Sequence, residues 1–107
     1  MYTRIVHCTV KPEKKTEFDR TLTNELLPRI KQQPGFIDVV EMYSQTNPNE
    51  FVCMTFWKSQ EAVNRYTSEL FPTVVQRLTP TLSGEAKVDT YSVQTSTPHR
   101  IAAGKAA

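Results

Sequence analysis

Three side chains in this sequence could do chemistry, namely His7, Trp57 and Tyr66. His7 could act as a base, because imidazole titrates near neutral pH. Tyr66 could hydrogen-bond a substrate oxygen or help to transfer a proton. Trp57, the single tryptophan, could form a flat pocket wall that stacks on an aromatic substrate. We therefore predict His7 and Tyr66 as catalytic residues and Trp57 as a substrate-binding residue.

Each of these residues also has a structural interpretation. His7 could be a hydrogen-bonded residue of a strand, Tyr66 a core tyrosine whose hydroxyl reaches the surface, and Trp57 a large ring that closes one end of the core. Tyr43 and Phe71 are predicted as further substrate-binding residues, with core or interface packing as the alternative. Arg4 and Arg65 could contact an anionic substrate, although a solvated surface position is the simpler interpretation.

The helices that would position these residues are indicated by spacing. Phe18, Leu22, Leu26 and Ile30 recur every four residues, which predicts one amphipathic helix from Pro12 to about residue 33. Pro28 should kink that helix or end its regular part. A second helix should follow Ser59, a good N-cap residue, and should bury four side chains. Those four are Ala62, Val63, Tyr66 and Leu70. A further helical piece should begin at Pro72.

Alternating apolar residues predict four strands, over residues 3–10, 36–44, 51–57 and 85–94. The order strand, helix, strand, strand, helix, strand predicts an α+β fold, a ferredoxin-like βαββαβ sandwich with an antiparallel sheet. Residues 1–94 should form this domain, and residues 95–107 an extended C-terminal tail. Strands one and three should be neighbours, which could bring His7 near Trp57 and Cys8 near Cys53.

The strands carry apolar residues on both faces, most clearly over residues 51–57. Helices can cover only one face of such a sheet. A second copy of the chain, sheet against sheet, is the simplest cover for the other face. The sequence therefore predicts a homodimer.

Composition excludes several classes of function. The net charge is +2 and the basic residues are mixed with acidic ones, so nucleic acid is not an expected partner. No segment has the roughly 18 apolar residues of a membrane span. The three glycines and two cysteines form neither a phosphate loop nor a set of metal ligands. We expect a cytoplasmic protein without a bound cofactor, in which Cys8 and Cys53 are buried thiols.

Three stretches resemble the antibiotic biosynthesis monooxygenase (ABM) family of dimeric α+β barrels. They read "VKPEKKTEF", "LLPRIKQQPGFIDVVEMYS" and "FVCMTFWKSQEAVNRYTSELF". Together they span most of residues 3–94. Members of that family include cofactor-independent oxygenases that act on polyketide or quinol-type aromatics, and haem-degrading enzymes.

The chain departs from the haem-degrading branch of that family. That branch pairs an asparagine in strand one with a tryptophan and with a histidine in the second helix. Trp57 has a plausible counterpart there, but strand one offers His7 and the helix offers Tyr66. The resemblance therefore does not imply haem degradation by that set of residues.

We accordingly predict a cofactor-independent monooxygenase that acts on a small aromatic or quinol-type substrate. A non-catalytic dimeric barrel that holds a small apolar ligand is the alternative. Haem binding through His7 as an axial ligand is another.

Overall fold

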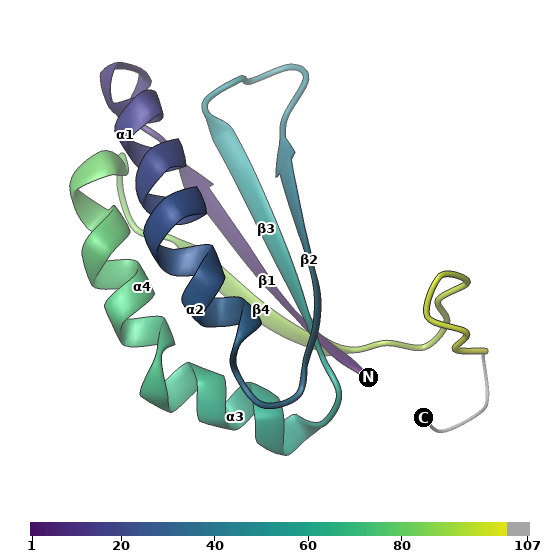
Figure 1. The fold of residues 1–107 in the computed structure, drawn as a ribbon. Coiled ribbons are helices and arrows are strands. Elements are labelled where there is room, and N and C mark those ends of the chain that lie inside the picture. The colour runs from purple at the N-terminus through teal and green to yellow at the C-terminus, as the bar shows by residue number, and fades with distance from the viewer. Residues whose placement is uncertain (103–107) are drawn as a thin grey trace.

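The structure is a computed structural model, and it describes residues 1–102. The strands are β1 (Tyr2–Thr9), β2 (Phe36–Tyr43), β3 (Glu50–Trp57) and β4 (Lys87–Ser92). The helical segments are η1 (Pro12–Lys14), α1 (Lys15–Arg20), η2 (Thr21–Leu26), α2 (Leu27–Lys31), α3 (Gln60–Glu69), α4 (Phe71–Leu78) and η3 (Thr79–Thr81). The strands form one antiparallel sheet in the order β2-β3-β1-β4. The helices lie along one face of this sheet (Figure 1). The predicted ferredoxin-like α+β fold is confirmed.

The first helical run continues past Pro28 because its hydrogen bonding changes before the proline. Pro28 has no amide hydrogen and cannot donate to the carbonyl four residues earlier. The preceding segment η2 is π-helical, and the Leu27 amide donates to the Leu22 carbonyl, five residues back. This wider turn accommodates the proline, so Leu26, Leu27 and Ile30 all stay buried.

The second helical run begins and breaks where the sequence indicates. The Ser59 side chain accepts a hydrogen bond from the Ala62 amide at 3.1 Å and caps α3. Pro72 lies in the first turn of α4, where its missing amide has no helical partner to lose. The predicted buried residues Ala62, Val63, Tyr66 and Leu70 are all buried.

The two faces of the sheet have different surroundings. On the helix side lie alternate residues of β1 and β3, among them Arg4, Cys8 and Cys53, which line a cavity under the helices. The opposite side, here called the outer face, carries the intervening residues. In β2 a bulge between Phe36 and Asp38 shifts the register. Phe36 therefore packs edge-on against Trp57, with ring centroids 5.7 Å apart.

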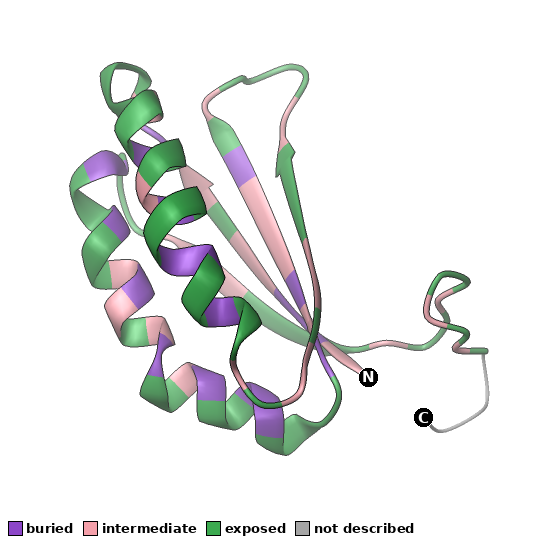
Figure 2. Cartoon of the chain, viewed as in Figure 1, coloured by how far each residue is buried: buried purple, intermediate pink, exposed green. Residues whose placement is uncertain are grey.

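The core lies between the sheet and the helices, where the buried stripe of each helix faces the strands (Figure 2). Its fully buried large side chains are Trp57, Phe18, Leu26, Ile30, Val10 and Val63. On the outer face, by contrast, Val40, Met42 and Tyr91 are exposed. No helix within residues 1–102 is long and apolar enough to cross a membrane.

Residues 93–102 continue from β4 beyond the sheet (Figure 1). The Val93 amide donates to the Met1 carbonyl, and Ser96 pairs with Ile101 across a turn. His99 lies 5.4 Å from the Phe56 ring and 3.7 Å from an Asp38 carboxylate oxygen. This segment therefore contacts its own chain at the β2–β3 end of the sheet. The rest of the predicted tail, residues 103–107, lies outside the described residues.

Gly35 should tolerate no side chain. Its φ is +81°, and a Cβ built there would lie 2.5 Å from the Cβ of Ala62. We expect Gly35→Ala to lower the free energy of unfolding by about 2–5 kcal/mol, from backbone strain and overpacking together. Gly84 is the matched control, since its φ is +88° with no atom within 4 Å of a built Cβ. Gly84→Ala should cost only about 1 kcal/mol. Equal losses in urea unfolding would refute this explanation.

Candidate active site

A cavity of about 50 Å³ lies between the sheet and the helices. Most of its lining is apolar and comes from the first helical run, α4 and the strands. The aromatic and polar lining residues are Arg4, Cys8, Phe18, Phe51, Cys53, Thr55, Tyr66 and Phe71. An apolar space with a few polar groups is typical of a small-molecule site. Tyr66 and Phe71, both predicted site residues, meet here.

Arg4 brings a positive charge into this cavity. Its side chain extends from β1 toward the helices and is only 8% exposed. The guanidinium carbon lies 4.2 Å from the centre of the Phe71 ring, a cation–π contact. Its Nε is buried and has no hydrogen-bond partner within residues 1–102. A buried guanidinium with a free donor is uncommon, and Arg4 is one of the residues that line the cavity.

Trp57 lies behind Tyr66. The two rings stack with centroids 4.7 Å apart, and Tyr66 in turn meets the edge of Phe71 at 5.8 Å. The indole Nε1 donates to the Thr55 hydroxyl at 2.8 Å, and Trp57 is 0% exposed. Trp57 is not part of the cavity lining. It fixes the orientation of the Tyr66 ring instead.

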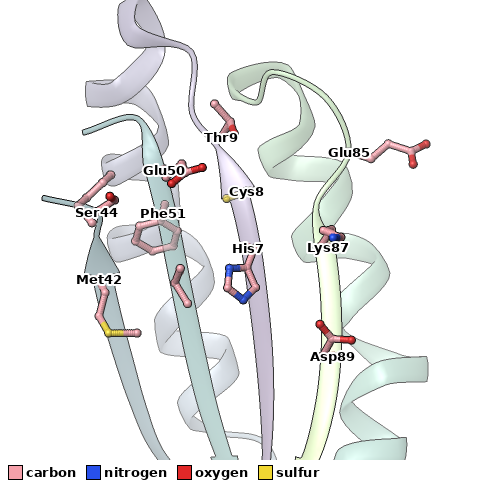
Figure 3. A pocket seen from close by; sticks show the side chains of 12 residues that line it. His7, Cys8, Thr9, Met42, Ser44, Glu50, Phe51, Glu85, Lys87 and Asp89 are labelled. Carbon is pink, nitrogen blue, oxygen red and sulfur yellow. The ribbon is translucent and has the colours of Figure 1, made fainter. Parts of the chain in front are cut away.

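His7 lies on the other side of the sheet. It is exposed on the outer face, in a hollow of about 580 Å³ formed across the four strands. Figure 3 shows its imidazole projecting from β1, with Lys87 and Asp89 on the neighbouring β4 and Met42 on β2. Within residues 1–102 no three His, Cys, Asp or Glu side chains gather as a metal site.

The expectation that His7 lies near Trp57 is wrong for a single subunit. Strands β1 and β3 are neighbours as predicted, but Tyr2 pairs with Trp57 and His7 pairs with Val52. The five-residue offset corresponds to roughly 17 Å along the strands. Because successive side chains alternate between faces, the sheet also separates His7 from Tyr66. These two predicted catalytic residues cannot act together on one substrate within one chain.

Tyr43 belongs to a different contact. Its hydroxyl donates to an Asp19 carboxylate oxygen at 2.7 Å, and the Lys15 ammonium lies 4.3 Å from its ring centre. Burial and the neighbouring carboxylate raise the pKa of Tyr43. The residue ties β2 to α1 and borders the outer hollow rather than the interior cavity.

The ionisable groups around the interior cavity other than Arg4 are neutral at physiological pH. Burial raises the pKa of Cys8 to about 11 and of Cys53 to about 12. Burial also raises the pKa of Tyr66, and the effect of Arg4 only partly opposes it. Tyr66 is therefore a hydroxyl donor rather than a base, and the thiols are poor nucleophiles because thiolate is scarce.

The sequence profile of the antibiotic biosynthesis monooxygenase family matches residues 1–81. The chain belongs to this family. No curated protein sequence matches the chain.

Solved structures with this ABM fold agree over most of the chain. A conserved protein from Methanosarcina mazei Go1 is 26% identical, with a TM-score of 0.72 over 85% of this chain and 91% of its own. A point mutant of SnoaB, a cofactor-independent oxygenase from Streptomyces nogalater, is 19% identical, with a TM-score of 0.69 over 91% and 96%. Rv0793 from Mycobacterium tuberculosis is 13% identical, with a TM-score of 0.73 over 90% and 97%. At the lower identities the agreement concerns the fold alone.

Arg4 is the cavity residue of this ABM domain that reasoning from the sequence misses. A solvated surface position is the simpler interpretation of its charge, whereas the structure buries it. A signal is present, because Arg4 precedes Val6 and Cys8 by two and four residues on the same face of the strand. Arg65, the other arginine expected at the surface, is exposed and pairs with Glu69, so its predicted surface position is confirmed.

The two thiols should make this ABM domain less stable as the pH rises into the alkaline range. A raised pKa means that the folded state holds the proton more tightly than the unfolded state. The protonated Cys53 thiol contributes fully to the free energy of unfolding below about pH 9, and this contribution is lost as the pH rises toward about 12. We expect the stability difference between the wild type and Cys53→Ala to shrink by about 1–2 kcal/mol between pH 9 and pH 11. Urea unfolding at both pH values measures it, and a constant difference would contradict the assignment.

Proposed function

We propose that this chain is a cofactor-independent monooxygenase that acts on a small aromatic or quinol-type molecule bound at the mouth of the interior cavity. The observation that carries the proposal is the apolar cavity within an ABM fold, with the protonated Tyr66 hydroxyl beside the Phe71 ring. A substrate oxygen that enters the cavity would be shielded from water on the sheet side and the helix side. Phe71 supplies a flat contact, and Trp57 holds Tyr66 in place from behind.

The chemistry proposed is oxidation of a phenol to a quinone by dioxygen. A ring C–H becomes a C=O with one oxygen atom, and the second oxygen atom leaves as water, so a phenol and O2 give a quinone and H2O. The electron-rich phenolate is the reacting species. Tyr66 would donate a hydrogen bond to the oxygen on which negative charge develops. The apolar walls would exclude bulk water from the intermediate.

A non-catalytic binding protein is the second candidate, and one observation favours it. The cavity contains no base, because Cys8, Cys53 and Tyr66 are protonated and His7 lies on the outer face. A monooxygenase of this design would have to take its substrate already ionised, or ionise it through bound water. A small-ligand carrier needs neither.

The proposal includes a homodimer in the cytoplasm. Support for the dimer comes from the outer face, where Val40, Met42 and Tyr91 are 37%, 40% and 53% exposed. Large apolar side chains exposed on one face of a sheet are a feature of interaction surfaces in proteins. In such a dimer His7 would face the partner subunit, so any catalytic role for it would belong to the interface. The unpaired Cys8 and Cys53 are consistent with a reducing compartment.

Oxygen consumption tests the enzymatic proposal. The protein is assayed with a panel of dihydroxynaphthalenes and benzoquinols, and quinone formation is followed by absorbance. We expect turnover with at least one compound, and Tyr66→Phe should lower kcat about 10²-fold. Tyr91→Phe, which removes a tyrosine hydroxyl that does not line the cavity, is the control. Tight binding without turnover of any compound would instead support the carrier.

Haem binding through His7 is tested separately. Haemin is added, and the Soret band is compared between the wild type and His7→Ala. A shift that requires His7 would support an axial ligand on the outer face. Identical spectra would exclude His7 from haem binding.

A further inference from the structure

Arg4 is a cation at the interior cavity for which residues 1–102 supply no anion. Arg4 takes part in none of the ion pairs formed within residues 1–102, which involve Lys14, Arg65, Arg77 and His99. Its Nε donor is buried and unsatisfied. A buried charge without a partner is costly, because burial removes its hydration without a compensating attraction. Phe71 covers one face of the guanidinium and leaves the donors at its edge free.

The polar neighbours cannot supply the missing charge. Cys8, Cys53 and Tyr66 carry no charge near neutral pH. The Thr55 hydroxyl already accepts from Trp57, and the remaining lining is apolar. Desolvation also lowers the pKa of Arg4, although a guanidinium stays charged at physiological pH. An anion from solution is therefore the group that would complete this site.

We propose that the interior cavity is a receptor for the carboxylate of a small apolar acid, bound by the edge of the Arg4 guanidinium. A guanidinium presents parallel N–H donors whose spacing matches the two oxygens of a carboxylate. The Tyr66 hydroxyl lies on the same cavity wall and offers a further donor. A neutral molecule with an acceptor oxygen could bond the Nε donor but would leave the charge of Arg4 unpaired.

The dimensions of the cavity limit what enters it. About 50 Å³ is room for roughly three or four waters, which suits a carboxylate with one or two carbons but not a whole aromatic ring. The cavity is partly open, and its lining residues Val75 of α4 and Ala86, just before β4, are only half-buried. The apolar body of the acid would lie toward this opening, against Phe71.

This inference deepens the proposed function, because it predicts that the substrate, or the carried ligand, is an acid. Its test is independent of turnover. Carboxylate binding is measured without an oxidisable substrate. The carboxylate proposal can therefore be refuted while oxygenase activity is observed, and oxygenase activity can be absent while carboxylates bind.

The experiment is isothermal titration of the full chain, in a buffer free of carboxylates and phosphate. Butyrate is compared with its neutral isostere butyramide, and benzoate with benzamide, at constant chloride. We expect each carboxylate to bind at least 10- to 100-fold more tightly than its amide, the range for a hydrogen bond to a charged group. Trp57 fluorescence gives a second signal, because Tyr66 stacks on the indole.

Arg4→Met is the decisive variant. It keeps much of the side-chain volume and removes the unpaired charge, so the urea midpoint should stay the same or rise. Carboxylate affinity should fall to that of the amide. Arg4→Lys keeps the charge without the paired donors and should retain part of the affinity. Arg65→Met removes an exposed arginine of α3 and should change nothing.

Three results would overturn the proposal. The first is equal affinity of the wild type for butyrate and butyramide. The second is an unchanged carboxylate affinity in Arg4→Met, and the third is a loss of carboxylate affinity in Arg65→Met as large as that in Arg4→Met. The first comparison uses only the wild-type protein, so the proposal can be refuted even if Arg4→Met does not fold.

Discussion

Trp57→Ala is expected to lower the free energy of unfolding by about 3–5 kcal/mol, the range for removing a large aromatic side chain from a core. Trp57 is fully buried. Its ring contacts Phe36 and Tyr66, and its indole N–H bonds the Thr55 hydroxyl. The substitution empties the space behind Tyr66, so the Tyr66 hydroxyl should also lose its fixed position.

Urea unfolding of Trp57→Ala and Trp57→Phe measures this effect. Trp57→Phe keeps a ring against Tyr66 but loses the indole hydrogen bond, so it should cost only about 1–2 kcal/mol. A stable Trp57→Ala protein that merely binds aromatic ligands less well would contradict this result. Trp57 would then be a pocket wall, the role first predicted for it, rather than a support for Tyr66.

Met54→Asp is expected to convert the proposed homodimer to a monomer. Met54 pairs with Ile5 on one side and Val40 on the other, which places it near the middle of the outer face. A carboxylate there would be desolvated in a sheet-to-sheet interface without a cationic partner, which costs several kcal/mol. In a monomer the same carboxylate would face water at little cost.

Light scattering after size exclusion separates the two states. The wild type should elute at twice the mass of the chain and Met54→Asp at the mass of one chain, with unchanged secondary structure by circular dichroism. Thr23→Asp places the same charge on the solvent side of η2 and should leave the dimer intact. A wild-type monomer would refute the proposed dimer, and a Met54→Asp dimer would refute the outer face as its interface.

Local patterns in the sequence were sufficient for the elements of this fold. Alternating residues predicted both ends of each of the four strands to within two residues. Ser59 and Pro72 marked the helix starts because capping and proline geometry depend on neighbouring residues only. The bulge at Phe36 and Asp38 had no such local signal, although it lets Phe36 pack against the core at Trp57.

The candidate site was only partly predictable from the sequence. Tyr66 and Phe71 were predicted as site residues, and the structure brings them together at the cavity. Arg4 was placed on the surface, although its alternation with Val6 and Cys8 pointed inward. A charged residue is almost never buried without a partner, and that general rule outweighed the local pattern here.

By itself, the sequence determined the element order, the antiparallel α+β fold and an apolar face on each side of the sheet, because hydrophobic periodicity and turn chemistry act over short distances. Only the tertiary structure decided which residues share a site. The pairing of His7 with Val52 and of Tyr2 with Trp57 put His7 on the outer face, away from Tyr66. Strand register is set by packing across the whole sheet, and one step of register moves a side chain to the opposite face.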